Sequence, residues 1–490
     1  MDGTLYVDTH WTIADSPVTF NGTVMVSNNV TLTIDPGVTV NLGVYRLFVS
    51  GTLVAVGSVD NEITFTAIAI YNYTISVSAP ISFGPTSTAW NDATNSGSII
   101  QNANLNQIEL QMSNASPKID SCTFSFQVSY IAPISISGGS PTISDNTITY
   151  NVQGSSSGIN VNSVVVYFGN PLVTNNNFEC NYYSSPSNDI KVSAGSPTIS
   201  NNVFAGAYSS SNNNGINVNS GTPVISNNQF EGKSYLNAIV DTSSSPFIIS
   251  NNLFSNCLSG ITAQAGSILT VVNNSFLEGT DGIYIAPESS VTVTDNLINH
   301  NSRFGIIGGG NINSNTITNN QVGIHNPPSG IITNNNIVGN TLNSIDSTTA
   351  NVDAENNWWG TTDTQTINQT IYDSKVDSKL GTVSFVPFLT QPSSSAPAIP
   401  DTTPIITPMP TPLATPQPTE TVTITTPTST PIQYSQTFIY QVGSIFNINT
   451  IVLVIVVVLV LAWVVVILGY GVKRSISKFT SNKVNSNDKG

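Results

Sequence analysis

The phrase "SPTISNNVF" at residues 196–204 decides the fold, because the chain repeats it with small changes. Related phrases are "SPTISDNTI" at 140–148, "NPLVTNNNF" at 170–178, "TPVISNNQF" at 222–230 and "PFIISNNLF" at 246–254. Each phrase contains a polar pair ending in Asn, followed two positions later by a large apolar residue. Self-similarity at a period of roughly 20 to 50 residues is typical of solenoids. We therefore interpret each phrase as one coil.

The second Asn of the phrase recurs along most of the chain. The aligned column consists of Asn146, Asn176, Asn202, Asn228, Asn252, Asn274, Asn296, Asn315, Asn335 and Asn356, and the apolar column beside it ends at Trp358. Spacings of 19 to 30 residues are too short for pairs of helices. Short apolar patches alternate with period two between Gly, Pro, Asn and Ser, which predicts β-strands.

Such a unit can bury its apolar side only against neighbouring units stacked about 4.8 Å apart. We expect the recurring Asn to lie at a turn and to adopt a left-handed backbone. Its amide can donate to one neighbouring coil and accept from the other, which makes the column a structural ladder. The alternative is a row of asparagines that binds a ligand.

These repeats resemble the right-handed parallel β-helix proteins of the pectate-lyase type, in particular the loosely defined NosD-like surface proteins of archaea and bacteria. The resemblance covers residues from about 20 to 360, with "GTVMVSNNVTLTIDPGVTV" at 22–40 similar to the first coils and "ENNWWGTTD" at 355–363 similar to the last. It implies an all-β fold. The expected parts are an N-terminal cap with the first coils (1–98), regular coils with the Asn ladder (99–360) and a C-terminal cap (361–390).

The composition changes after Leu389. Residues 391–445 are rich in Pro and Thr and predict a disordered, extended stalk. The uncharged apolar run at 451–468 predicts one transmembrane helix within 446–470. The tail at 471–490 holds five of the 12 Lys and Arg residues, so the positive-inside rule places it in the cytoplasm and the large N-terminal domain outside the cell. No signal peptide is recognisable, which leaves a removed leader or a tail-anchored protein of opposite orientation.

The composition also limits which classes of partner the protein can bind. Only 8% of the residues are charged and the net charge is -15, which argues against nucleic acid as a partner. Three scattered Cys and three His indicate neither a disulfide framework nor a metal site, and we expect no cofactor. An external domain fits N-glycosylation, and the candidate sequons are Asn21, Asn29, Asn72, Asn114, Asn273 and Asn368.

A second recurring phrase, "GI" followed by a variable residue, predicts an outward-facing column. The column contains Asn160, Lys191, Asn217, Val240, Thr262, Tyr284, Ile307, His325 and Asp346. We expect His325 and Asp346 to touch, with Tyr284 two coils away. Together with Lys191, these residues are the candidate ligand-binding set, because phenol, imidazole and carboxylate groups bind sugars well. The alternative is an exposed His–Asp pair on a polar wall.

The signals for catalysis are weaker. Glu179 and Glu231 occupy equivalent places two coils apart, which is too far for the two carboxyl groups of a glycoside hydrolase. The "GTDG" at 279–282 resembles a polygalacturonase motif whose other parts are absent from the sequence. We therefore predict a non-catalytic, membrane-anchored surface protein that binds a polysaccharide or cell-envelope glycan. The alternatives are a surface-tethered polysaccharide lyase or glycoside hydrolase, and an accessory or maturation factor.

Overall fold

The computed structural model describes residues 1–400 of the chain, apart from ten short stretches. These are residues 69, 73–74, 78–79, 127–131, 153–160, 183–186, 206–212, 233–235, 328–329 and 348. The described residues belong to one compact unit, Met1–Pro404. The predicted transmembrane helix (446–470) and basic tail (471–490) lie outside the described residues. Within the described part, no helix is long and apolar enough to span a membrane.

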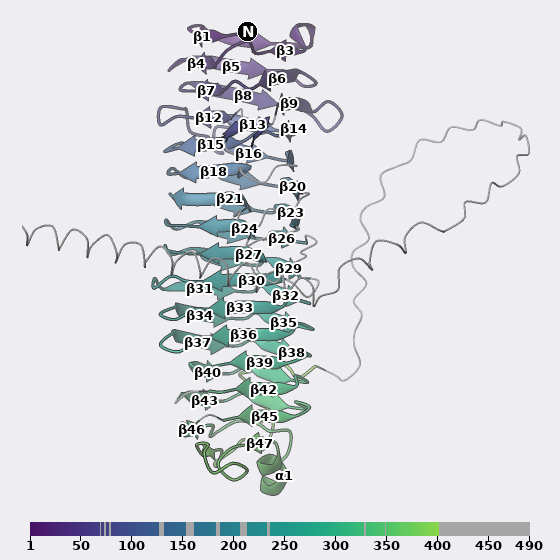
Figure 1. The fold of residues 1–490 in the computed structure, drawn as a ribbon, viewed down its shortest axis with the longest axis vertical. Coiled ribbons are helices and arrows are strands. Elements are labelled where there is room, and N and C mark those ends of the chain that lie inside the picture. The colour runs from purple at the N-terminus through teal and green to yellow at the C-terminus, as the bar shows by residue number, and fades with distance from the viewer. Residues whose placement is uncertain are drawn as a thin grey trace, which may run out of the picture. The chain divides into compact units, whose positions relative to one another are not determined.

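The described chain is wound into coils of three short strands (Figure 1). One coil consists of β24 (Ser187–Val192), β25 (Thr198–Ser200) and β26 (Val203–Phe204). Each of these strands pairs in parallel with the strand three elements later in the chain. The prediction of an all-β parallel solenoid is therefore confirmed for the described residues.

Three long parallel sheets result, and we call them A, B and C. Sheet A has 16 strands, from β1 (Gly3–Leu5) to β47 (Ile371–Tyr372). Sheet B also has 16, from β2 (Thr9–Trp11) to β48 (Val383–Ser384). Sheet C has 14, from β3 (Val18–Thr19) to β44 (Asn336–Val338). A coil runs from A through B to C, so the chain has three faces that can carry function.

The core follows from period two within each strand. In β34 (Ile268–Val272), Leu269 and Val271 are buried, while the residues between them face outward. Sheet C contributes a stack of phenylalanine rings, because each coil places the same residue type at the same point. The centroids of neighbouring rings lie 4.9, 4.5, 5.0 and 4.6 Å apart for the series Phe178, Phe204, Phe230, Phe254 and Phe276. Their planes are within 8° of parallel.

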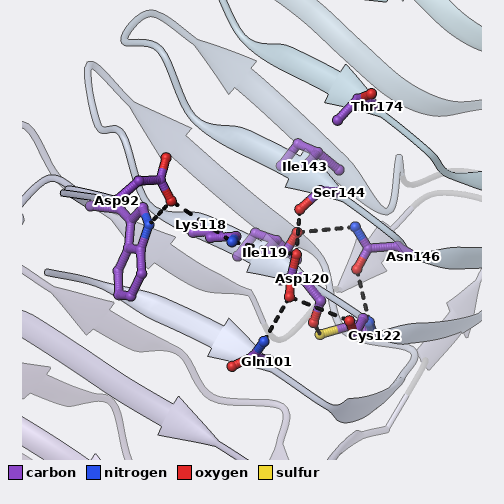
Figure 2. Close-up of polar contacts among 12 residues, drawn as sticks. Asp92, Gln101, Lys118, Ile119, Asp120, Cys122, Ile143, Ser144, Asn146 and Thr174 are labelled. Carbon is purple, nitrogen blue, oxygen red and sulfur yellow. Dashed lines mark hydrogen bonds and ion pairs between the residues drawn. The ribbon is translucent and has the colours of Figure 1, made fainter. Parts of the chain in front are cut away.

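The asparagine ladder runs along the corner between sheets B and C. Asn146 Nδ2 donates to the carbonyl of Ile119 on the preceding coil at 3.1 Å, and Oδ1 accepts from the backbone N–H of Cys122 at 2.9 Å (Figure 2). The same Nδ2 reaches Oδ1 of Asn176 on the next coil at 2.9 Å. This pattern repeats as far as Asn335. The ladder side chains from Asn146 to Asn335 are at most 2% exposed, so they bind other coils rather than a ligand.

The last ladder position is Asn357, and the prediction of Asn356 was wrong. The backbone N–H and Nδ2 of Asn335 both donate to Oδ1 of Asn357, at 2.9 and 3.0 Å. Asn356 is exposed instead. The same shift of one residue makes Trp359 the core residue in place of Trp358, with 6% exposure.

The left-handed backbone was also assigned to the wrong residue of the pair. It belongs to the residue before each ladder asparagine, as Asn201 and Asn227 show with φ of 57°. Asx residues tolerate this conformation best, and Asp145 and Asp295 replace Asn at two of these positions. One residue of each pair therefore makes the turn, and the next one builds the ladder.

A second, shorter ladder lies at the corner between sheets C and A. Asn301 Nδ2 donates to Oδ1 of Asn320 at 2.8 Å, and Asn320 Nδ2 donates to Oδ1 of Asn340 at 3.1 Å. This ladder was not predicted, although its spacings of 19 and 20 residues match those of the main ladder in the same coils.

The C-terminal part closes the solenoid and then returns along its side. Helix α1 (Thr364–Gln369) begins after Asp363, whose side chain accepts the backbone N–H groups of Gln365 and Thr366. After β48 the chain passes onto the outer face of sheet C, where the N–H of Ser393 donates to Asn336 Oδ1 at 2.8 Å. Residues up to Pro397 are bound to this face, so any stalk starts beyond Pro397 rather than at 391.

Candidate ligand-binding face

The outward column of sheet A has the register that the sequence predicts. Tyr284 on β36 (Asp281–Ile285) pairs with Ile307 on β39 (Phe304–Ile307), which pairs with His325 on β42 (Val322–His325). His325 pairs with Asp346 on β45 (Asn343–Asp346), and Asp346 pairs with Tyr372 on β47. The neighbouring Ile residues on these strands are buried, so the column faces outward. We call the outer surface from Tyr284 to Tyr372 the sheet A face.

Two of the predicted residues do not join this group. Lys191 lies in the same column, but four coils separate it from Tyr284, a distance of about 19 Å. Asn160 lies outside the described residues, and Val165 on β21 (Val161–Phe168) occupies the position next to Lys191. The candidate set therefore reduces to Tyr284, His325 and Asp346.

The glycine of the "GI" phrase is required by close packing. A Cβ atom at Gly282, Gly305 or Gly323 would lie 2.4 to 2.6 Å from the backbone oxygen of the next coil. Real Cβ atoms do not approach oxygen so closely, so only glycine fits. The phrase that reveals the column is therefore a packing device, and the variable residue after it is free to serve function.

His325 is fixed by two hydrogen bonds. Its Nδ1 lies 2.9 Å from Asp346 Oδ2, and its Nε2 lies 2.9 Å from Asn326 Nδ2. An amide NH₂ group can only donate, so Nε2 is the acceptor and the neutral ring carries its proton on Nδ1. The side chains of His325 and Asp346 are 24% and 23% exposed, so a ligand on this face can reach both.

An aromatic ring and an ion pair support the imidazole from the preceding coils. Phe304 stacks on His325 with centroids 4.2 Å apart and planes 15° from parallel. The guanidinium carbon of Arg303 lies 5.0 Å from the Phe304 ring centroid. Arg303 Nε donates to Asp281 Oδ1 at 2.9 Å, and Arg303 Nη2 also pairs with the other oxygen of Asp281. The hydrogen bond to Asp281 raises the pKa of Arg303.

These contacts form one chain of side chains over four neighbouring coils. Its order is Asp281, Arg303, Phe304, His325 and Asp346. Only the last two members, His325 and Asp346, were predicted from the sequence. Asp281 stands in the "GTDG" stretch, and Arg303 and Phe304 stand directly before a "GI" phrase. Tyr372 was missed because its "TIYD" context contains no "GI" phrase.

The arrangement suits binding better than bond cleavage. Asp281 and Asp346 lie three coils apart, about 14 Å, whereas glycoside hydrolases need two carboxyl groups about 5 to 9.5 Å apart. Each carboxylate is already paired with a basic side chain. The lone pair of His325 Nε2, which a general base would use, accepts from Asn326. Among the described residues, no group of three or more His, Cys, Asp or Glu side chains could hold a metal ion.

The other candidate carboxylates lie on a different face. Glu179 and Glu231 project from sheet C, where each accepts a hydrogen bond from an amide of its own coil. Asn177 Nδ2 donates to Glu179 at 2.7 Å and Gln229 Nε2 donates to Glu231 at 2.6 Å. Both are therefore ordinary surface pairs away from the sheet A face.

The predicted sequons and two of the three cysteines can also be placed. Four of the predicted sequons, Asn21, Asn29, Asn114 and Asn273, are exposed, and Asn368 is half-buried on α1. The side chain of Asn72 lies outside the described residues. Cys122 and Cys257 are buried, and burial raises the pKa of each thiol to about 12. These two thiols are therefore unreactive core residues.

Comparison with known proteins adds to the fold. The family model described as "Right handed beta helix region" matches residues 169–322. The chain contains a right-handed parallel β-helix. No curated protein matches the chain.

Solved structures give only distant similarities. Crystal structures of a single and a double mutant of the periplasmic alginate epimerase AlgG share 11% and 13% identity with the chain. Their TM-scores are 0.24 and 0.27, over 75% of both chains in each case. The A-module of the mannuronan C-5 epimerase AlgE4 from Azotobacter vinelandii shares 12% identity with a TM-score of 0.23, over 75% of this chain and 88% of that one. Scores this low carry no argument about activity, so the function of the β-helix has to be argued from its own residues.

Proposed function

We propose that the β-helix binds a neutral glycan on the sheet A face and has no catalytic role. The observation that carries the proposal is the fixed and accessible His325–Asp346 pair, aligned between Tyr284 and Tyr372 on one surface. Tyrosine rings pack against sugar faces, and the polar pair can bind hydroxyl groups. These groups lie in line on successive coils along the axis, which suits an extended polymer.

The aromatic contact belongs to the two tyrosines rather than to Phe304. One face of the Phe304 ring is covered by the imidazole of His325, and the ring also lies against the guanidinium of Arg303. Tyr372 is 37% exposed and Tyr284 is half-buried, so both present ring surface to solvent. They lie four coils apart, about 19 Å, which spans several sugar units.

The charges of the face favour a neutral ligand. Asp281 is neutralised by Arg303, while Asp346 contributes a negative group beside the imidazole of His325. Asp346 and the overall charge of -15 repel an acidic polysaccharide. Hydroxyl groups of neutral sugars can donate to Asp346 Oδ1, which has no hydrogen-bond partner among the described residues.

The test is a glycan array probed with the full-length protein in detergent. Binding to neutral glycans that falls in Tyr284→Ala supports the proposal. Lys191→Ala is the matched control, because this residue shares the column but lies about 19 Å away. The proposal is contradicted if Tyr284→Ala and Lys191→Ala bind neutral glycans equally well. It is also contradicted if the wild type releases new reducing ends or unsaturated sugars. Either product would favour the tethered enzyme.

We also propose that the protein is a single-pass membrane protein with the β-helix outside the cell. The proposal rests on the apolar run at 451–468 and the basic tail that follows it. Protease added to intact cells is expected to cut the Pro/Thr-rich tract and release the β-helix. Release from permeabilised cells alone would indicate the opposite orientation.

A further inference from the structure

The segment after the C-terminal cap is bound to the outer face of sheet C. The N–H of Ser393 donates to Asn336 Oδ1 at 2.8 Å, and the carbonyl of Pro397 accepts from Thr316 Oγ1 and, at 3.5 Å, from Asn336 Nδ2. Ser314 Oγ donates to Ser395 Oγ at 3.1 Å. We call residues 391–397 the strap. Two coils hold it, through β41 (Thr316–Thr318) and β44, together with the turn before β41.

The burial of sheet C marks where the strap lies. One outward column contains Gln229, Leu253, Ser275, Leu297, Thr316 and Asn336 in consecutive coils. The first four are half-buried. Thr316 and Asn336 are 0% and 1% exposed. The change occurs at the two residues that bind the strap, so the strap covers these two coils.

The site recognises main-chain groups. Asn336 uses both ends of its amide, since Oδ1 accepts from the N–H of Ser393 while Nδ2 donates to the carbonyl of Pro397 and to Thr316 Oγ1. In the four preceding coils this column holds Gln229, Leu253, Ser275 and Leu297, which share no hydrogen bond with the strap among the described residues. A Ser- and Pro-rich peptide suits such a site, because its backbone groups are not used in its own secondary structure.

We propose that the strap is a latch. It transfers a pulling force on the C-terminal continuation of the chain to the two coils that contain β41 and β44. Coils at the end of a solenoid are supported on one side only and are the easiest to peel away. Strand β48 pairs with β46 (Val352–Asp353) through only two residues. A force applied at Pro400 therefore acts on the strap and on β41 and β44 before it acts on the weak pairing between β48 and β46. The inference does not depend on the glycan proposal.

Hydrogen exchange of the full-length protein in detergent tests the docking. The amide of Ser393 is expected to be protected in the wild type, because its N–H donates to Asn336 Oδ1. Asn336→Ala removes this acceptor, so the Ser393 amide is expected to exchange about tenfold faster, which corresponds to about 1.4 kcal/mol. Gln229→Ala, in the same column away from the strap, is the matched control and is not expected to change this rate. An unprotected Ser393 amide in the wild type would overturn the docking. Ser393→Pro removes the N–H itself and serves to undock the strap in the pulling experiment.

Single-molecule pulling tests the load path, with one handle beyond Pro400 and the other at the N-terminus. The first rupture in the wild type is expected to release the strap, and in Ser393→Pro the first event is expected to be unfolding of the cap at lower force. An identical first event in both variants would overturn the latch. Strap protection that depends on protein concentration would also overturn it, because the strap would then bind a second copy.

Discussion

The ladder corner between sheets B and C and the sheet A face are built from the same coils, yet they follow different rules. At the ladder corner one residue type repeats in every coil, each Asn binds the next, and the side chains are buried. On the sheet A face the residue type changes at every coil and the groups remain accessible. The regular region therefore sets the geometry, and the irregular region is where the coils differ in chemistry. Changes in the regular region should therefore lower stability, whereas changes on the sheet A face should alter binding alone.

The largest effect is expected when the ladder is broken in its middle. Asn228→Leu removes the acceptor for the backbone N–H and the Nδ2 of Asn202, and the donor to the carbonyl of Ile199. Each buried group left without a partner costs about 1 to 3 kcal/mol, and several are lost together. Chemical denaturation should show a large loss of stability, with exchange increasing first in the neighbouring coils. An unchanged transition would contradict the ladder at this position.

A slightly smaller loss is expected in the phenylalanine stack. Phe276→Ala removes a ring that is 1% exposed and stacks 4.6 Å from Phe254. Large-to-small changes of this kind cost about 3 to 5 kcal/mol. Thermal and urea unfolding measure the loss, and the matched variant Tyr284→Ala on the sheet A face should leave stability nearly unchanged. If both variants lose stability equally, Tyr284 is not a surface residue.

The third comparison distinguishes the two asparagines at the end of the ladder. Asn357→Ala removes the Oδ1 that accepts two bonds from Asn335, so a loss of about 1 to 3 kcal/mol is expected. Asn356→Ala changes an exposed turn residue with φ of 59°, where only the preference for Asx in a left-handed backbone is lost. Equal losses in urea unfolding would contradict the assignment of Asn357 to the ladder.

The part of the molecule that could be predicted is the part that repeats. Any one phrase is too short to fix its strands and register, but ten equivalent phrases agree on them. The sheets, the ladder and the Phe stack could therefore be predicted from the spacing. The one-residue error at Asn356 arose where the last phrase, "ENNWWG", has three polar residues in a row and offers two registers. His325 and Asp346 were predicted to touch because they lie in the same phase of the repeat as the "GI" phrase.

The contacts that were not predicted involve residues outside the column that the "GI" phrase marks. Arg303 and Phe304 precede the "GI" phrase, and their contact with His325 depends on how side chains lean across coils. The strap was interpreted as part of the stalk, because residues 391–445 are rich in Pro and Thr. Nothing in its own sequence indicates that Asn336 and Thr316 bind it. Such contacts are formed by single residues, and a repeat pattern does not reveal them.

A carboxylate in the apolar column of sheet A gives a pH-dependent prediction. Asp241 stands where its neighbours have Val218 and Ala263, it is fully buried, and its Oδ2 has no partner among the described residues. Burial raises its pKa above the ordinary value of 3.8. The native state therefore binds this proton more tightly than the unfolded chain does. The stabilisation is complete below the unfolded pKa and is lost as the pH rises through the native pKa.

The variant Asp241→Asn removes this titration. Urea unfolding at pH 4 and at pH 7.5 should show a smaller loss of stability in the variant than in the wild type over that interval. Asp363, whose pKa is lowered by its hydrogen bonds to Thr366, titrates in the opposite sense but is the same in both proteins. An identical pH dependence in the two proteins would mean that Asp241 is solvated in the native state.

The smallest effect is expected on the sheet A face, and it appears only in binding. Asp346→Ala removes the partner of His325 Nδ1, so the imidazole loses its fixed tautomer and orientation, and a ligand loses one acceptor. A net hydrogen bond contributes about 0.5 to 1.5 kcal/mol, so the dissociation constant should rise roughly 2- to 12-fold while the melting temperature stays nearly constant. Asp353→Ala is the matched control, because this carboxylate faces outward from sheet B in the next strand along the chain. Calorimetry with the glycan that the array identifies measures both variants. Equal weakening would mean that overall charge, and not the geometry around His325, determines binding.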